Sequence, residues 1–197
     1  MPSEPLILAF DTSAAHCAAV LLQGDRLRSA RFAEMARGQA EALFPMLEAV
    51  LAEAGAGWSD LDAIAVGIGP GNFTGLRIAV SAARGLALST GKPAIGVSAL
   101  EVQADSPPCL ASLDAKRGRH YVQAFPDGTP QMTENLEDFC PDLPRAQPVP
   151  PQEIAEKIAR LAAQKLTSGG PFARPAPLYI RAADAAPPRD PAPVILD

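Results

Sequence analysis

Hydrophobic residues occur in short blocks over the first third of the chain, and polar or glycine-containing turns separate the blocks. Leu6–Phe10 and Cys17–Leu22 are apolar runs of strand length, and Arg26–Phe32 is a more polar run of similar length. The link Gln23–Asp25 contains a glycine and is short enough for a tight turn. The pattern therefore predicts three consecutive strands joined as an antiparallel meander.

A helical period follows these strands. Within a helix predicted over 34–55, apolar residues recur every three or four positions and share one face: Leu43, Leu47, Val50, Leu51 and Ala54. Pro45 lies inside this range, where a proline removes one hydrogen bond and costs ~3 kcal/mol. We therefore expect a kink at Pro45 or a helix that starts late. Phe44 and Met46 lie off the main stripe, and either a partner or a broad core face would explain them.

The next stretch reads as strand, glycine turn, helix and strand. Ala63–Ile68 is a buried-strand pattern, and 69–72 is the turn Gly-Pro-Gly-Asn. A helix is predicted from about Thr74 to Ser89, because Asn72 or Thr74 can accept the free amides of its first turn. Its many alanines and glycines would let another backbone approach closely. Gly91 ends the helix, and the strand Ala94–Val97 follows.

The glycine turn matches neither named phosphate-binding loop. Asn72 and Thr74 occupy the positions where Gly-x-Gly-x-x-Gly needs its third glycine, and no Gly-Lys-Ser/Thr follows at P-loop spacing. Two interpretations remain: a general anion site at a helix N-terminus, or a tight connection in which glycine supplies unusual backbone angles. The residues by themselves favour the tight connection.

The order strand–strand–strand–helix–strand–helix–strand is typical of a ribonuclease-H-like unit, as used in actin-like (ASKHA) folds. We therefore predict an α/β protein whose mixed sheet has flanking helices. Ser98–Ala104 predicts a further short helix with a Ser98–Glu101 capping box.

The second half repeats part of the opening pattern. Strand 109–113, Asp114, a turn and strand 120–125 resemble the run through Asp11, which indicates a reduced second α/β unit. We also expect a helical turn within 134–140, a helix over 152–165 with Ile154, Ile158, Leu161 and Ala162 inward, and an edge strand at 178–180. The predicted divisions are an N-terminal domain 1–105, a smaller domain 106–184 and a flexible proline-rich tail 185–197.

Composition narrows the class of protein. The 197 residues carry a formal net charge of −5, which argues against a primary nucleic-acid binder. No apolar run approaches membrane-spanning length, and the first residues lack a signal-peptide pattern, so we expect a cytoplasmic protein without membrane contact. Three widely spaced cysteines indicate reduced thiols and not a disulfide framework.

No strong catalytic constellation is present in the sequence. His16 and His120 have no metal-ligand spacing, and no Gly-x-Ser-x-Gly elbow occurs. Each histidine reads as a surface or strand residue. His16 and Cys17 are adjacent on a strand, so their side chains should point to opposite faces and not form a catalytic pair. Asp11 and Asp114, at matching strand ends, could hold a cation and phosphates in one cleft or could cap turns.

One block is quite specific. Gly69–Ala79 (Gly-Pro-Gly-Asn-Phe-Thr-Gly-Leu-Arg-Ile-Ala) with Ala83–Leu88 behind it resembles the signature of the TsaB (YeaZ) family, which serves in tRNA N6-threonylcarbamoyladenosine synthesis. Four further stretches are also similar to that family: Ile7–Ser13, Gly96–Glu101, Leu113–Gly118 and Pro177–Arg181 followed by Asp184. Gln39–Pro45 fits as well, but Gln39 and Ala40 replace the His-Ser that is usual there.

The resemblance implies a non-catalytic actin-like subunit that pairs with the transferase TsaD, joins the ATPase TsaE and can self-associate as a homodimer. It implies contact with tRNA only through the complex. Partner-interface residues would lie on the two helices, at Glu41, Phe44, Met46, Leu47, Leu76, Arg77, Val80 and Arg84.

The resemblance also implies no cofactor of the chain's own, with ATP or ADP and Mg²⁺ entering in the complex. Nucleotide contacts at the subunit junction would then be Asp11, Thr12, Gly69, Gly71, Asp114 and Lys116. Lys116 stands where the family more often has arginine. The region between Phe125 and Pro177 looks shorter than in many relatives.

Two other functions stay open at this point. A stand-alone actin-fold ATPase or phosphotransferase would use Asp11 and the Gly69–Thr74 turn, and would bind ATP with Mg²⁺ unaided. A glycoprotease-like protein is the weaker alternative, because the sequence offers neither metal ligands nor a nucleophile elbow.

Overall fold

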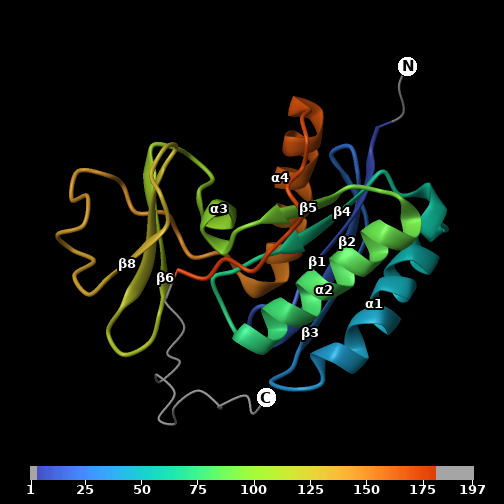
Figure 1. Ribbon diagram of the computed structural model, residues 1–197, viewed down its shortest axis with the longest axis horizontal. Helices are drawn as coiled ribbons and strands as arrows, with labels where there is room; N and C mark the ends of the chain where they lie inside the picture. Colours follow the sequence, from blue (N-terminus) through green and yellow to red (C-terminus); the bar gives the residue numbers. More distant parts are fainter. Residues whose placement is uncertain (1–3, 181–197) are drawn as a thin grey trace, which may run out of the picture.

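The computed structural model describes residues 4–180, which form two β-sheets with helices (Figure 1). The larger sheet has the strand order β3-β2-β1-β4-β5. β1 (Leu6–Asp11), β2 (His16–Gln23) and β3 (Arg26–Glu34) pair antiparallel, whereas β4 (Ala63–Gly67) and β5 (Ala94–Val97) run parallel to β1. This is the predicted ribonuclease-H-like, actin-like mixed sheet, and its three-strand meander is confirmed.

Helices cover both faces of this sheet. α1 (Gln39–Glu53) and α2 (Phe73–Thr90) lie on one face, and α4 (Ile154–Ser168) lies on the other (Figure 1). Successive residues of a strand point to opposite faces, so Leu8 and Phe10 enter the core beneath α1 and α2, whereas Ile7 and Ala9 enter the core beneath α4. The near-continuous apolar runs in the sequence are explained by this double coverage.

The helix predicted from Glu34 starts five residues later. Glu34 still belongs to β3, where it pairs with His16, and Gly38 turns the chain with a φ of 91° before α1 begins at Gln39. Pro45 remains inside the helix. The apolar stripe is buried as predicted, with Leu43, Leu47, Val50 and Leu51 in the core.

The second sheet is small and antiparallel, with the order β6-β7-β8. Its strands are β6 (Cys109–Asp114), β7 (His120–Phe125) and β8 (Gln131–Thr133). α3 (Ala99–Gln103) connects the two sheets, and Ser98 and Glu101 form its predicted capping box. Two short 3-10 helices, η1 (Trp58–Asp60) and η2 (Pro151–Glu153), complete the elements.

Three expectations for the second half were wrong or incomplete. The helical turn expected within 134–140 is limited to a single turn at residues 136–138, closed by the Phe139 amide donating to Leu136 O at 3.3 Å, and β8 was not foreseen. Residues 178–180 are not a strand. Among the described residues, one backbone hydrogen bond, from Leu178 N to Ile68 O at 2.8 Å, joins this segment to the residue that follows β4, and one bond does not make a ladder. α4 fills the far face of the first sheet although the predicted division places it in the second domain.

The predicted tail 185–197 lies outside the described residues. Within residues 4–180, no helix has both the length and the apolar character needed to cross a membrane.

Candidate functional site

The turn after β1 is organised by a buried carboxylate. Oδ2 of Asp11 accepts hydrogen bonds from the Ser13 amide at 3.0 Å and the Ser13 hydroxyl at 2.8 Å, and it lies 2.8 Å from Nε2 of His16. Asp11 is 1% exposed and His16 is 2% exposed, and the imidazole also packs on Phe32. A buried carboxylate needs such partners. The histidine read from sequence as an ordinary strand residue is therefore the partner of Asp11.

The second unit repeats this turn. Oδ1 of Asp114 accepts from the amide of Lys116 at 2.8 Å, two residues on, as Asp11 does from Ser13. Oδ2 of Asp114 also pairs with Nζ of Lys116 at 3.1 Å, and these bonds lower the pKa of the exposed Asp114 carboxyl. Both aspartates thus cap turns, which is one of the two roles that the sequence left open, and the shared geometry supports the repeat.

The N-terminal end of α2 packs directly on the first turn. The Asn72 amide donates to Ser13 O at 2.6 Å, and the Thr12 hydroxyl donates to Gly75 O at 2.7 Å. A Cβ at Gly75 would lie 1.8 Å from Thr12 O, and one at Gly71 would lie 2.5 Å from Ser13 O. These glycines therefore permit close approach of two backbones, which accounts for the glycine-rich turn without any ligand.

The first amides of α2 are also partly occupied. Asn72 caps the helix, because its Oδ1 accepts from the Gly75 amide at 2.9 Å, and its carbonyl accepts from the Leu76 amide at 2.9 Å. The capping predicted for Asn72 is confirmed.

Little space remains between the two sheets at this point. A cavity of about 60 Å³ is lined by Asp11 and Gly69, by Leu113 of β6, and by Ile154 and Ile158 of α4. Drug-sized ligands occupy sites of roughly 300–1,000 Å³, so a nucleotide does not fit there. Of the predicted nucleotide contacts, Thr12 is buried and Gly71 exposed, whereas Asp114 and Lys116 lie exposed on the β6–β7 turn. The expectation of a nucleotide and Mg²⁺ in the complex stays a prediction.

The thiols nearby are poor nucleophiles. Burial, with a further contribution from the Asp11 carboxylate, raises the pKa of Cys17 to about 11. Burial also raises the pKa of Cys109. Among residues 4–180, no group of three or more His, Cys, Asp and Glu side chains is arranged to hold a metal ion.

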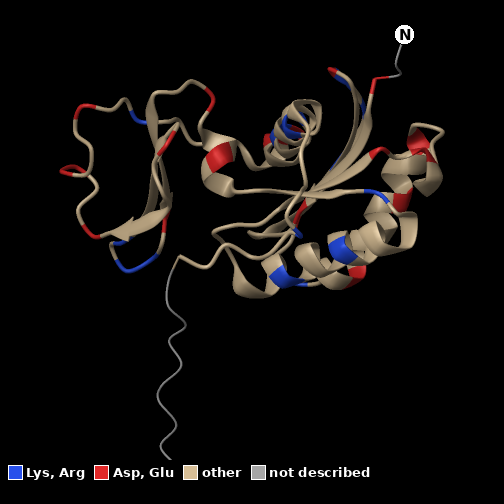
Figure 2. Ribbon diagram, turned by 45° about the horizontal axis from the view of Figure 1, so that its top comes forward, with Lys and Arg blue, Asp and Glu red and all other residues tan. Residues whose placement is uncertain are grey.

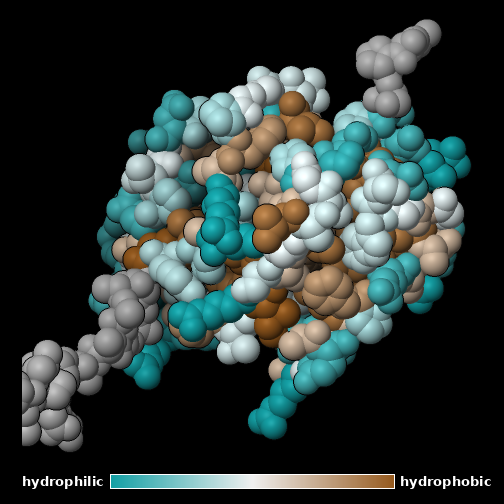
Figure 3. Space-filling model, turned by 45° about the vertical axis from the view of Figure 1, so that its right-hand side comes forward, coloured by the Kyte–Doolittle hydropathy of each residue, from teal (hydrophilic) through white to brown (hydrophobic). Residues whose placement is uncertain are grey.

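The outer side of α1 and α2 is a second candidate site. Three large apolar side chains stay exposed there, Phe44 at 44%, Phe73 at 53% and Leu88 at 87%. Glu41 and Arg77 are exposed on the same helices. Figure 3 shows hydrophobic atoms reaching the surface in patches among hydrophilic ones on one side of the molecule. We call this surface the α1–α2 face, formed by Glu41, Phe44, Phe73, Arg77 and Leu88.

Part of the predicted interface lies inside the chain instead. Leu47, Leu76 and Val80 are at most 2% exposed and contact the chain's own core, so they offer no side chain to a partner. Their apolar spacing reflects packing of the helices on the sheet. Met46 packs against the core, and Arg84 is half-buried with Nε donating to Pro175 O at 2.6 Å.

Contacts within the chain fix the side chains at one end of the α1–α2 face. The Arg77 guanidinium carbon lies 3.8 Å from the Phe73 ring centroid, and the Tyr179 ring lies 5.6 Å from the Phe73 ring. Nε of Arg77 donates to the Tyr179 hydroxyl at 3.2 Å. Tyr179 was not predicted as a site residue, because its partner Arg77 lies 102 positions away in the sequence and so long a separation gives no local signal.

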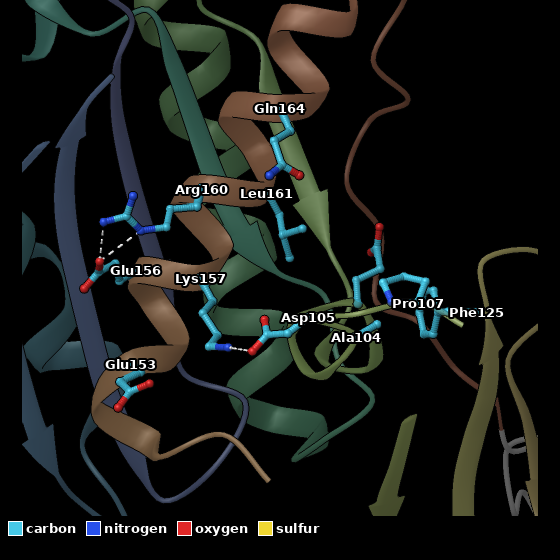
Figure 4. A pocket seen from close by; sticks show the side chains of 11 residues that line it. Ala104, Asp105, Pro107, Phe125, Glu153, Glu156, Lys157, Arg160, Leu161 and Gln164 are labelled. Carbon is cyan, nitrogen blue, oxygen red and sulfur yellow. Dashed lines mark hydrogen bonds and ion pairs between the residues drawn. The ribbon is translucent and has the colours of Figure 1, made fainter. Parts of the chain in front are cut away.

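An open pocket of about 810 Å³ lies between α3, α4 and the end of β7 (Figure 4). Its two cations are paired with acids: Lys157 with Asp105, and Arg160 with Glu156 at 2.6 Å. Leu161 and Phe125 supply its apolar wall. The Lys157–Asp105 pair links α4 to the segment after α3, whereas Arg160 and Glu156 pair within α4. The pocket therefore offers no free cation to a ligand among its lining residues.

Comparison with known proteins gives a consistent result. A family model described as "TsaD: tRNA N6-adenosine threonylcarbamoyltransferase" matches residues 33–183. The tRNA threonylcarbamoyladenosine biosynthesis protein TsaB of Escherichia coli is 38% identical over 122 residues, covering 58% of this chain and 52% of that protein. TsaB of Haemophilus influenzae is 33% identical over 123 residues, covering 58% and 51%. The chain thus spans about half the length of the curated relatives it matches.

Among solved structures, YeaZ from Pseudomonas aeruginosa superposes with a TM-score of 0.64 at 26% identity, and the match covers 89% of this chain and 99% of that one. A second structure, of an uncharacterized protein with similarity to peptidase YEAZ from the same organism, has a TM-score of 0.70 at 26% identity.

Proposed function

We propose that this chain, which belongs to the TsaB (YeaZ) family and matches the TsaD family model over residues 33–183, is a partner subunit in the synthesis of N6-threonylcarbamoyladenosine in tRNA. In this proposal it pairs with TsaD and supports transfer of the threonylcarbamoyl group to adenosine 37 without catalysing the transfer itself. TsaE joins the pair, and the chain alone forms a homodimer.

The observation that carries the proposal is the α1–α2 face. Its Phe44, Phe73 and Leu88 leave large apolar surface in water, and removal of apolar surface from water is the main favourable term in most protein–protein association. Exposed aromatic and arginine side chains are also the residues that most often dominate binding free energy. The Phe73–Arg77–Tyr179 arrangement is held by internal contacts, so little side-chain freedom would be lost on binding.

The closed cleft supports an accessory role over a stand-alone ATPase. Asp11 already has three partners, and the cavity beside it is about 60 Å³. A nucleotide beside Asp11 would need surfaces contributed by another subunit. The raised pKa of the Cys17 thiol gives no support to a thiol-based protease.

A charge placed at Leu88 tests the proposal. Leu88 is 87% exposed, so Leu88→Glu should leave the fold unchanged while a buried, unpaired carboxylate weakens pairing with TsaD by at least tenfold. Leu27→Glu on β3 is the matched control, since Leu27 is also an exposed leucine at 39% but pairs in the sheet with Leu22, whose side chain enters the core beneath α4 and not the core beneath α1 and α2. The measurements are sedimentation velocity of the mixture and tRNA modification in a reconstituted reaction.

The pairing site is wrongly assigned if both variants pair like the unchanged chain. The proposed function fails altogether if the unchanged chain neither binds TsaD nor raises the yield of modified tRNA.

A further inference from the structure

The turn between β6 and β7, residues Ala115–Arg119, is a cationic projection on an acidic chain. Lys116, Arg117 and Arg119 place three cations within four positions, against one carboxylate at Asp114, whereas the whole chain has a net charge of −5. We call residues 115–119 the basic turn. Figure 2 shows it as a blue tip at the end of the smaller sheet.

The backbone of the basic turn has a constrained conformation, and the side chains of Lys116 and Arg117 are exposed while that of Arg119 is half-buried. Lys116 and Arg117 have φ values of 65° and 55°, followed by Gly118 at 71°. The left-handed region costs a non-glycine residue about 1–2 kcal/mol, and such strain persists where the surrounding structure enforces it. Here it is enforced by the Asp114–Lys116 bonds and by the Ala115 amide donating to Arg119 O at 2.8 Å.

Two of the three cationic side chains in the basic turn have no partner within residues 4–180. Lys116 pairs with Asp114, but the side chains of Arg117 and Arg119 make no hydrogen bond or ion pair with any residue of the described range 4–180. Most other cations of the second half are engaged, as Lys157, Arg160 and Lys165 are with acids on α3, α4 or nearby. Unpaired arginines on a rigid projection are suited to phosphate oxygens, which the guanidinium group binds in a forked geometry.

The basic turn lies toward the same edge of the molecule as the N-terminal end of the α1–α2 face. In Figure 1 the tip of the β6–β7 hairpin and the N-terminal end of α2 both lie at the lower edge of the molecule, and Figure 2 agrees. A partner on the α1–α2 face would leave the basic turn beside the junction, free to reach a substrate held by that partner.

We propose that the basic turn contacts the phosphate backbone of the tRNA substrate through Arg117 and Arg119. This inference rests on the proposed function, which supplies the RNA. The contact adds sequence-independent affinity, because neutralising phosphates releases counterions from the nucleic acid. It also makes the chain a direct contributor to tRNA binding, whereas the family resemblance implied contact only through the complex.

The test is binding of an unmodified tRNA transcript to the complex of this chain with TsaD, measured by fluorescence anisotropy between 50 and 200 mM KCl. Arg117→Gln with Arg119→Gln should weaken binding about tenfold and lower the slope of log K against log salt by about 2, roughly 1 per lost phosphate contact. Arg26→Gln with Lys92→Gln removes the same charge from other exposed or half-buried positions. That control should change affinity less than twofold.

The named outcomes separate the inference from its premise. An unchanged salt slope, or an equal loss in the control pair, would overturn the phosphate contact. A loss of ADP or ATP affinity with unchanged tRNA affinity would assign the basic turn to a free nucleotide and overturn the RNA contact. A chain that pairs with TsaD and supports modification while its turn variants bind tRNA normally leaves the proposed function intact, whereas a chain that does not pair overturns both.

Discussion

Alanine at Gly75 should destabilise the chain, and alanine at Gly85 in the same helix should stabilise it. Both residues lie inside α2, where alanine is favoured over glycine by about 1 kcal/mol. They differ in surroundings, because a Cβ at Gly85 meets nothing within 4 Å, whereas one at Gly75 would lie 1.8 Å from the carbonyl oxygen of Thr12.

The free-energy cost of Gly75→Ala follows from the backbone shift that the added Cβ requires. The first turn has to shift by more than 1 Å to clear a Cβ, which is a case of overpacking that costs about 1–3 kcal/mol. The shift would also break the 2.7 Å bond from the Thr12 hydroxyl to Gly75 O, and losing a buried hydrogen bond costs about 1–3 kcal/mol. After subtracting the helix preference, the expected loss for Gly75→Ala is about 3 kcal/mol.

Thermal unfolding followed by circular dichroism measures both variants under one set of conditions. For a domain of this size about 1 kcal/mol corresponds to roughly 2–4 °C in Tm. Gly75→Ala should therefore lower Tm by about 10 °C, and Gly85→Ala should raise it by about 3 °C. Equal shifts of the same sign would refute the close packing of α2 on the 12–13 turn, and with it the explanation given for the glycine-rich stretch.

Two predictions concern the buried groups at the end of β1. His16→Ala should lower the free energy of unfolding, measured by urea denaturation, by about 2–3 kcal/mol, since it removes a hydrogen bond to the buried carboxylate of Asp11. A double variant, Asp11→Asn with His16→Ala, should recover part of this loss. No recovery would mean that the two groups are not coupled. Because the pKa of Cys17 is raised from an ordinary value of 9.0 to about 11 in the folded chain, the folded state holds the proton more tightly. Stability from this group is complete below pH 9.0 and is lost as pH rises toward 11. Comparison with Cys17→Ala should show a shallower loss of stability in that window, and parallel curves would contradict the assigned burial of the thiol.

Much of the first unit could be predicted because its signals are local. Strand lengths, the Asn72 cap and the Ser98–Glu101 capping box each depend on residues a few positions apart. The larger sheet follows from the order of its elements, since parallel strands joined by helices have few allowed topologies. The second half was predicted less well, because β8 is short and α4 packs on a sheet whose last strand ends more than fifty residues earlier in the chain.

The candidate site, too, was predicted from the sequence only in part. Apolar spacing marked Leu47, Leu76 and Val80, but periodicity reports only that a side chain is apolar, and the nearest apolar surface was the chain's own sheet. Exposure of Phe44 and Leu88 depends on which side of each helix that sheet covers. Tyr179 reaches Phe73 only because the segment after α4 returns along α2.

The sequence alone determined the class of fold, the family resemblance and the helix caps at Asn72 and Ser98, because these depend on patterns and spacings within short windows. The tertiary structure decided that His16 pairs with Asp11, that the cleft between the sheets is nearly filled, and which apolar residues of α1 and α2 remain in water. Those outcomes depend on which distant surfaces meet. Burial is a property of the meeting surfaces and not of the residues taken one at a time.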